Sequence, residues 1–155
     1  MSATITARGY TVPSLTESGT LPAGVTFTDN GNGTATIKGT PAPGSGGRYP
    51  VTLTAANQLG TTGEAYVVKV DEPPAITSQH SAAATIGDRF SFLITTTGYP
   101  APKITETGVL PAGISLGSGG LTGTPKRGTS GTYPITIAAA STAGTVTQNF
   151  TLTVS

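Results

Sequence analysis

Residues 39–55 read GTPAPGSGGRYPVTLTA, and residues 123–139 repeat the pattern as GTPKRGTSGTYPITIAA. The second half of each stretch alternates between apolar and polar residues. The apolar positions are Tyr49, Val51, Leu53 and Ala55 in the first copy and Tyr133, Ile135, Ile137 and Ala139 in the second. Because successive side chains of a strand point to opposite faces, this alternation predicts a strand with one buried and one exposed face.

The repetition extends beyond these stretches. Gly9-Tyr10 recurs as Gly98-Tyr99, and the LPAG sequence of Leu21–Gly24 recurs as Leu110–Gly113. Further alternating apolar sets are Val25 with Phe27, Ala35 with Ile37, Tyr66 with Val68 and Val70, Phe90 with Phe92 and Ile94, Ile114 with Leu116, and Phe150 with Leu152 and Val154. Gly and Pro punctuate the chain about every ten residues, and no segment has a helical period. The sequence therefore predicts an all-β protein built from two copies of one unit.

The two copies predict two antiparallel β-sandwiches, at residues 1–71 and 76–155. Residues 72–75 include Pro73 and Pro74 and form the predicted linker. Because adjacent prolines favour a stiff, extended chain, we expect the two sandwiches to lie end to end.

The first copy is shorter at its start. When Gly9 is aligned with Gly98, Met1 falls opposite Phe90, so residues 76–89 have no counterpart in the first copy. We interpret these residues as a first strand and expect the first sandwich to lack it, in a chain cut from a longer array. An unpaired strand edge invites another strand. We therefore expect the first sandwich to be the less stable one, to self-associate through its open edge, and to be completed by preceding residues in the longer protein.

The composition excludes several classes of function. Only 10% of the residues are charged and the net charge is +1. The charges are scattered, so the chain has no basic footprint for nucleic acid. No apolar run approaches the roughly 18 residues of a membrane span, so we expect no membrane insertion. Cysteine is absent, and each sandwich must therefore be stabilised by its own core rather than by disulfides.

The order of these motifs resembles the "putative Ig" modules of bacterial secreted and cell-surface proteins, which are relatives of cadherin-like domains. The resemblance rests on LPAG, a hairpin, Gly-Thr-Pro, Gly-x-Tyr-Pro and a final alternating strand, in the same order in both copies. It implies tandem immunoglobulin-like sandwiches of about seven strands, located outside the cell. The chain lacks the Cys pair and the Trp of antibody domains. Tyr49 and Tyr133 stand where such sandwiches place a corner tyrosine.

The sequence offers no catalytic set. His80 is the single histidine and lies in a polar Ser-Gln-His-Ser stretch, where we expect it to be exposed. A general base needs a nucleophile and an orienting group, and neither is recognisable beside it. Zinc sites of the usual kind need clustered Cys or His. We therefore predict that the protein is not an enzyme.

Calcium is the one cofactor that the sequence leaves open, because cadherin-like relatives bind it between domains. The candidate ligands are Asp71 and Glu72 at the linker and Asp88 in a turn of the second unit. Calcium takes six to eight oxygens, so three scattered carboxylates make a sparse set. The Asp29–Gly33 stretch (DNGNG) has one carboxylate and is typical of a hairpin turn. We expect the melting temperature to respond little to millimolar calcium.

Two motifs with known chemistry have plainer interpretations. LPAG is internal, occurs twice and precedes no apolar tail, so we interpret it as a turn rather than a wall-anchoring signal. An internal Lys–Asn isopeptide bond requires a buried lysine. Lys69 alternates with Tyr66, Val68 and Val70, and Lys38 adjoins the inward Ile37, so both lysines are predicted to point outward.

Tyr10 and Tyr99 are the candidate ligand-binding residues. Each follows a glycine at the same turn of its unit, and an aromatic ring on a loop can stack on a sugar. A repeated position is equally expected of a packing residue. The sequence thus predicts a non-enzymatic extracellular spacer pair that adjoins further domains of a longer chain. The alternative is an adhesion or carbohydrate-binding pair.

Overall fold

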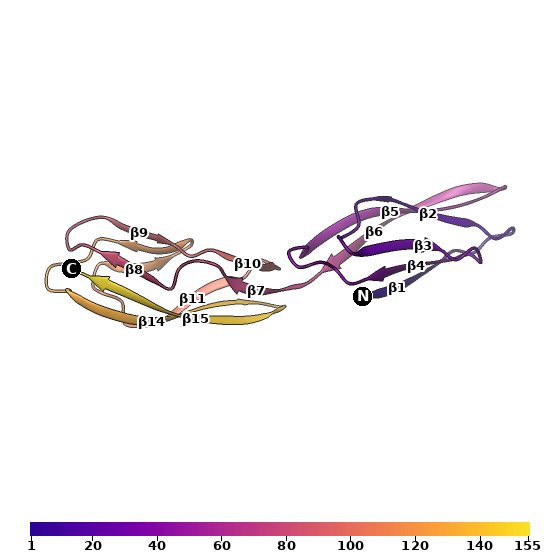
Figure 1. Cartoon of the computed structure of the whole chain (residues 1–155). Helices are drawn as coiled ribbons and strands as arrows, with labels where there is room; N and C mark the ends of the chain where they lie inside the picture. The colour runs from indigo at the N-terminus through magenta and orange to yellow at the C-terminus, as the bar shows by residue number, and fades with distance from the viewer. The chain divides into compact units, whose positions relative to one another are not determined.

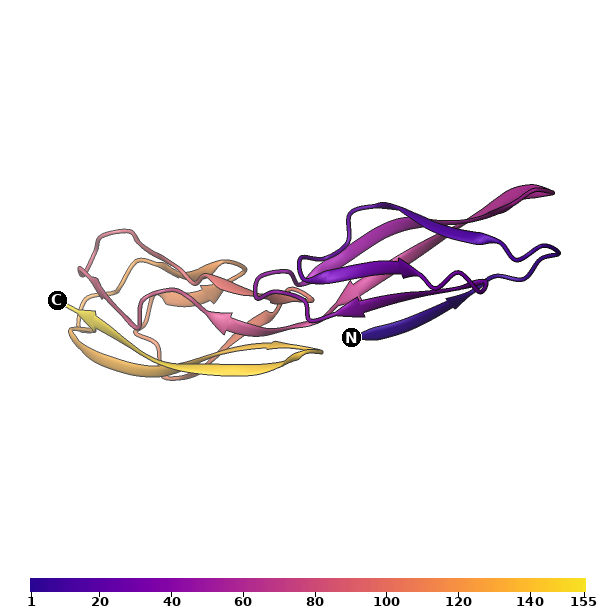
Figure 2. The same ribbon diagram turned by 45° about the vertical axis from the view of Figure 1, so that its right-hand side comes forward.

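The computed structural model describes residues 1–155, which fold into two separate all-β units. Unit 1 comprises Met1–Glu72 and unit 2 comprises Pro73–Ser155. Each unit is a sandwich of two layers of strands, as Figure 1 and Figure 2 show. The chain contains no helix that is long and apolar enough to cross a lipid bilayer. The predicted fold of two tandem immunoglobulin-like sandwiches is confirmed.

Unit 1 contains six strands in two sheets of three. The strands are β1 (Ser2–Thr6), β2 (Ser14–Gly19), β3 (Val25–Asp29), β4 (Thr34–Gly39), β5 (Gly47–Asn57) and β6 (Gly60–Val70). One sheet has the order β1-β4-β3 and the other β2-β5-β6, and all pairs are antiparallel. β5 contains the alternating residues Tyr49 to Ala55, and Val51 and Leu53 are buried as predicted.

Unit 2 repeats this arrangement and adds strands at its start. Its strands are β7 (Glu72–Ile76), β8 (Ser81–Ala84), β9 (Phe90–Leu93), β10 (Thr96–Tyr99), β11 (Lys103–Gly108), β12 (Ile114–Gly117), β13 (Gly120–Gly123), β14 (Gly131–Ser141) and β15 (Gly144–Val154). The sheets have the orders β12-β13-β9, β11-β14-β15-β8 and β10-β7. β8 runs parallel to β15, and the other pairs within the two larger sheets are antiparallel.

Two expectations about the junction need correction. Residues 72–75 are not a separate linker, because they form most of β7 and pair with β10. Within residues 76–89, where one first strand was expected, β7 ends at Ile76 and the short strand β8 follows at Ser81–Ala84. Proline favours extended backbone for itself and for the residue before it, so the sequence Glu-Pro-Pro-Ala suits a strand. Its missing N–H groups are tolerated on an edge strand such as β7.

The repeat pairs β1 with β9, β2 with β11, β3 with β12, β4 with β13, β5 with β14, and β6 with β15. Unit 1 has no counterpart of β7 or β8, as the sequence predicted. In unit 2, β15 has β14 on one edge and β8 on the other, whereas β6 in unit 1 is paired with β5 alone. One edge of β6 is therefore open within unit 1.

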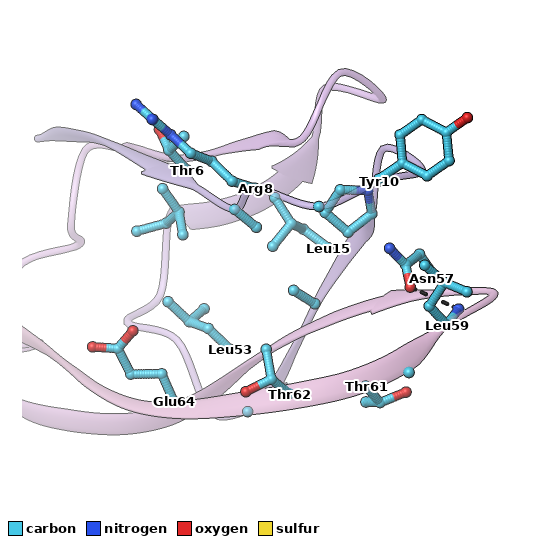
Figure 3. Close-up of a pocket in the computed structure, with 17 residues that line it drawn as sticks. Thr6, Arg8, Tyr10, Leu15, Leu53, Asn57, Leu59, Thr61, Thr62 and Glu64 are labelled. Carbon is cyan, nitrogen blue, oxygen red and sulfur yellow. Dashed lines mark hydrogen bonds between the residues drawn. The ribbon is translucent and has the colours of Figure 1, made fainter.

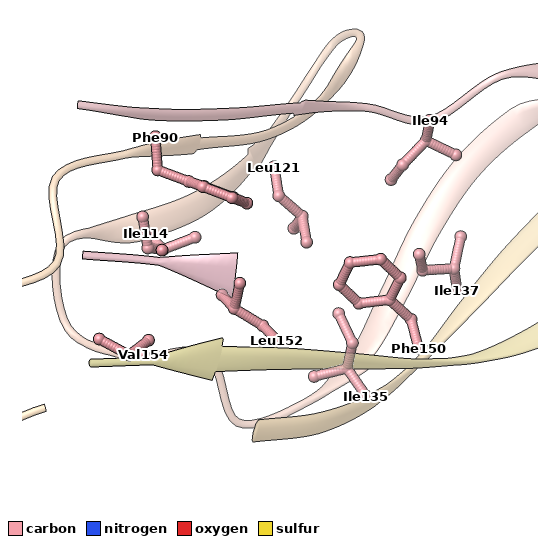
Figure 4. Close-up of a cluster of buried hydrophobic side chains, with 10 residues drawn as sticks. Phe90, Ile94, Ile114, Leu121, Ile135, Ile137, Phe150, Leu152 and Val154 are labelled. Carbon is pink, nitrogen blue, oxygen red and sulfur yellow. The ribbon is translucent and has the colours of Figure 1, made fainter. Parts of the chain in front are cut away.

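The two cores differ in extent. In unit 2, ten buried residues form one cluster that includes Phe90, Leu121, Phe150 and Leu152 (Figure 4). The Phe92 and Phe150 rings meet at a centroid distance of 4.8 Å. In unit 1 the contiguous cluster contains Val25, Ile37 and Val68, and the other buried apolar residues are Leu15, Ala35, Val51, Leu53 and Val70. Burial of apolar surface is the main stabilising contribution in a chain without disulfides, so unit 1 has the smaller hydrophobic stabilisation.

In each unit the LPAG motif and the Gly-Thr-Pro motif pack against each other through their backbone atoms. This contact explains why both motifs recur. In unit 1 the amide of Ala42 donates to the carbonyl of Ala23 at 2.9 Å, and in unit 2 Lys126 donates to Ala112 at 3.0 Å. Gly24 has a φ of 81°, and a Cβ atom added there would lie 2.4 Å from the carbonyl oxygen of Thr40. Only glycine fits this close approach. The turn expected for LPAG is therefore present and is held by the second motif.

A corner tyrosine fastens the start of the long strand in each unit. The Tyr49 hydroxyl donates to the carbonyl of Ser45 at 2.8 Å, and the Tyr133 hydroxyl donates to the carbonyl of Thr129 at 3.0 Å. Both acceptors lie four residues upstream, which is the arrangement of a tyrosine corner. The role suggested for these tyrosines by the resemblance is confirmed.

Replacing Gly24 by alanine should destabilise unit 1 more than the same change at Gly44. The two glycines have φ values of 81° and 82°, but a Cβ atom at Gly44 would meet nothing within 4 Å. In both variants alanine must adopt a left-handed backbone conformation, which lowers the free energy of unfolding by about 1–2 kcal/mol. Gly24→Ala adds an overpacking cost of about 1–3 kcal/mol. Urea unfolding followed by the amide NMR signals of unit 1 measures the difference, and equal losses would contradict the backbone-packing explanation.

Asp29 joins the two sheets of unit 1. Its carboxylate accepts hydrogen bonds from the backbone amides of Leu15 at the start of β2 and of Gly31 in the hairpin, each at 3.0 Å. These two amides, Leu15 first, hold the pKa of Asp29 below its ordinary value of 3.8. The carboxylate is thus stabilised in the folded state relative to the unfolded chain.

This pKa shift makes the stability of unit 1 dependent on acid pH. A lowered folded-state pKa stabilises the fold above the unfolded pKa of 3.8, and the contribution is lost as pH falls below that value toward the folded pKa. We expect the melting temperature of unit 1 to fall more steeply below about pH 4 in the native protein than in Asp29→Asn. Parallel pH profiles for the two proteins would contradict this role.

Candidate functional site

A concavity lies in unit 1, between β1, the start of β2 and the β5–β6 hairpin. Its volume is about 670 Å³, which is within the usual range of ligand pockets. The apolar part of its wall comes from Ile5, Leu15, Leu53 and Ala55. Figure 3 shows Leu15, Leu53 and Glu64 around the open space, with the Tyr10 ring at the rim.

The same region of unit 2 is filled by protein. The counterpart of Ile5 is Ile94, which is 4% exposed, whereas Ile5 is only half-buried. The counterpart of Ala55 is Ala139, which is fully buried, whereas Ala55 remains partly exposed. In unit 2 the additional cover comes from β7, β8 and the turn after β8, because Ile76, Ala82 and Ile86 pack against the core. The cavity of unit 1 thus marks the place where unit 2 has two more strands.

A row of side chains on the inner face carries two carboxylates. In unit 1, Glu17 lies opposite Leu53, and Leu53 lies opposite Glu64. Residues directly opposite one another in antiparallel strands share a face, and Leu53 is buried, so both glutamates belong to the inner face. One carboxylate oxygen of Glu17 is buried with no hydrogen-bond partner. Glu64 lines the cavity and is exposed.

The equivalent row in unit 2 is Glu106, Ile137 and Gln148. The Gln148 side-chain amide donates to the carbonyl of Ser78, between β7 and β8, at 3.2 Å. Apolar alternation alone does not predict this row, because its outer members are polar. The signal was available: Glu17 and Glu106 each occupy an inward position two residues after an inward Leu15 or Ile104.

The two candidate tyrosines have different surroundings. Tyr99 belongs to β10, which pairs with β7, and is half-buried. Tyr10 is 88% exposed and lies at the rim of the cavity, in a segment that is not a strand. Figure 3 shows its hydroxyl directed away from the cavity. The repeated Gly-Tyr pair therefore packs in unit 2 and is left free in unit 1, where no β7 counterpart is present.

Asp71 and Glu72, two of the candidate calcium ligands, already have partners in unit 1. Asp71 forms an ion pair of 2.7 Å with Lys69. The Glu72 carboxylate accepts hydrogen bonds from the amides of Gly44 at 2.6 Å and Gly46 at 3.1 Å. Asp88 lies in a turn of unit 2, where its amide donates to Thr85. No group of three or more His, Asp or Glu side chains in the structure could hold a metal ion.

The remaining titratable candidates lie on the surface. His80 is exposed, and its carbonyl accepts a hydrogen bond from the amide of Thr151 at 3.0 Å. Lys38 and Lys69 are both exposed. The predicted outward orientation of the two lysines is confirmed, and neither is placed for an internal isopeptide bond.

Several solved structures share the fold. Titin Ig tandem domains A164-A165 match all of this chain and 88% of theirs, with a TM-score of 0.62 and 13% identity. The insect immune protein hemolin matches all of this chain and 43% of its own, with a TM-score of 0.55 and 15% identity. A further match, with a TM-score of 0.48 and 27% identity over 53% of this chain, is to a Bacteroides fragilis protein described as a "putative alpha-galactosidase/melibiase". The match spans 17% of that protein's chain.

Both units match one protein-family model. No curated protein sequence matches the chain. The model described as "Putative Ig domain" matches twice, at residues 1–71 and at residues 73–155. Its two matches coincide with the two sandwiches, the motif order and the corner tyrosines described above. The chain therefore belongs to the Putative Ig domain family and contains two copies of that domain in tandem.

Proposed function

We propose that the chain is a non-enzymatic, extracellular spacer pair of a bacterial surface or secreted protein. Family membership supports the coarse part of this proposal, because Ig-like domains of this kind are typical of structural and adhesion modules on surface proteins. The bacterial and extracellular setting rests on the resemblance of the repeated motifs to modules of such proteins. A spacer must resist bending at its joint, so the residues that connect the two units are the ones that matter for this function.

The residues on both sides of the boundary between the units are held by hydrogen bonds. Glu72 is fixed to unit 1 by the hydrogen bonds from Gly44 and Gly46. The next residues belong to β7, which pairs with β10 in unit 2, and Pro74 is buried there. A connection of this kind leaves few unpaired residues between the units, whereas a Gly/Ser-rich linker behaves as a random coil. This anchoring is the single observation that favours a spacer.

Single-molecule energy transfer between dyes in unit 1 and unit 2 tests the proposal. We expect a narrow distance distribution for the native chain and a broader one for Glu72→Ala, which removes the anchor in unit 1. Asp71→Ala is the matched control, because the Asp71–Lys69 pair is about half exposed on both sides, at 50% and 44%, and such pairs contribute little. A native distribution as broad as that of a flexible linker of the same length would contradict the spacer function.

A second candidate function is carbohydrate binding, and the exposure of Tyr10 beside the cavity favours it. A glycan array probed with the native chain, Tyr10→Ala and Tyr99→Ala separates the two functions. The spacer proposal predicts no saturable binding by any of the three. Binding that Tyr10→Ala loses and Tyr99→Ala retains would establish the second function instead, because an exposed ring can stack on a sugar while a half-buried one cannot.

A further inference from the structure

We propose that Asn32, in the β3–β4 hairpin, is a site of spontaneous deamidation at which the hairpin itself promotes the loss of ammonia. The hairpin contains two Asn-Gly pairs, Asn30-Gly31 and Asn32-Gly33, whereas the corresponding turn of unit 2, Gly117–Gly120, has no asparagine. The hydrogen bonds of the hairpin leave the two asparagines in opposite states of reactivity. Such a modification site is independent of the spacer function.

The reaction is the attack of a backbone nitrogen on the side chain that precedes it. The Gly33 nitrogen forms a bond to Cγ of Asn32, the Cγ–Nδ2 bond breaks, and the side-chain amide leaves as ammonia with the proton of the Gly33 amide. Water then opens the cyclic imide. Cleavage between Cγ and the Gly33 nitrogen gives aspartate, and cleavage at the backbone carbonyl carbon of Asn32 gives isoaspartate. Nothing is oxidised or reduced, and water is the only other reactant.

The surroundings of Asn32 favour this attack. Its side-chain oxygen accepts hydrogen bonds from the Thr34 amide at 3.1 Å and from the Thr34 hydroxyl at 2.6 Å. Attack on Cγ places negative charge on this oxygen, so the two donors act as an oxyanion hole. The attacking Gly33 amide has no hydrogen-bond partner in the protein, and neither has the Asn32 side-chain NH₂ group. Asn32 is exposed, so ammonia can leave and water can enter.

Asn30 is an internal reference, because its groups are held in the opposite way. The Gly31 amide, which would have to attack, donates to the Asp29 carboxylate at 3.0 Å. Loss of its proton would place a second negative charge beside that carboxylate, which is unfavourable. The Asn30 NH₂ group, which would have to leave, donates to the hydroxyls of Thr34 at 2.9 Å and Thr36 at 3.1 Å. No donor contacts the Asn30 side-chain oxygen, so an oxyanion there has no support from the protein.

The modified residue lies where the hairpin is held to the end of β1. The Gly33 carbonyl accepts a hydrogen bond from the Ala7 amide at 2.8 Å, and the Asn30 amide donates to the Thr34 carbonyl at 2.9 Å. Isoaspartate routes the backbone through an additional CH₂ group between residues 32 and 33, so the two bonds cannot both keep their geometry. We therefore expect the isoaspartate form to lower the melting temperature of unit 1 and to leave that of unit 2 unchanged.

Peptide mapping by mass spectrometry of the whole chain, incubated at neutral and at mildly alkaline pH, tests the proposal. Aspartate and isoaspartate are measured separately at Asn32 and at Asn30. The same chain unfolded in urea is the reference, because both Asn-Gly pairs lose their hydrogen bonds there. We expect Asn32 to react faster than Asn30 in the folded chain and the two rates to approach each other in urea. Both rates should rise with pH, because the attacking nitrogen must lose its proton.

Variants of Thr34 separate the oxyanion donor from a general loosening of the hairpin. Thr34→Val removes the hydroxyl donor and should slow the reaction at Asn32 by about 2- to 13-fold, which corresponds to one hydrogen bond of about 0.5–1.5 kcal/mol. Thr34→Ser keeps the hydroxyl and should retain the native rate. Thr36→Val is the matched control, because it removes a partner of Asn30 alone and should leave the rate at Asn32 unchanged.

Two results would overturn the proposal. The first is a ratio of the Asn32 rate to the Asn30 rate that is no higher in the folded chain than in urea, because the hairpin would then not promote the reaction. The second is a rate at Asn32 that Thr34→Val leaves unchanged or raises, because the hydroxyl would then not stabilise the oxyanion. The first comparison uses the native chain alone, so it holds even if a Thr34 variant fails to fold.

Discussion

Closure of the space between two sheets is the constraint on which each unit depends. The chain has no cysteine, so no disulfide ties one sheet to the other. A sandwich then depends on apolar side chains that must be covered on every side and on backbone groups that must be paired. Unit 2 meets both requirements through β7 and β8. Unit 1 shows what the same two sheets look like when this cover is absent.

The internal repeat makes each unit a reference for the other. The close backbone packing of LPAG against Gly-Thr-Pro and the corner tyrosine are the same in both units, so these features do not depend on the first strands. One set of differences lies on the side that β7 and β8 cover in unit 2, where Tyr10 and Val67 of unit 1 are exposed and the cavity lies. Asp29 also fastens β2 to the hairpin after β3 in unit 1, where unit 2 has the shorter turn of Gly117–Gly120.

The sequence was sufficient for the fold because alternation is a local signal. The positions of Val51, Leu53, Ile135 and Ile137 follow from period two, and the missing strand follows from aligning the copies. The pairing of residues 72–75 within β7 does not follow from the sequence. Proline fixes the local backbone, but whether an extended segment joins a sheet depends on a distant partner, here β10. The cavity and the Glu17–Leu53–Glu64 row depend on the pairing register across three strands, which no single stretch of sequence encodes.

Hydrogen exchange at one pair of equivalent amides tests the central claim that unit 1 is an uncovered version of unit 2. The account predicts fast exchange at Val67, on the open edge of β6, and slow exchange at Thr151, whose amide donates to His80. Val68 serves as the control within β6, because its backbone groups face β5 and should be protected. Protection of Val67 equal to that of Val68 and Thr151, in the isolated monomer, would contradict the account.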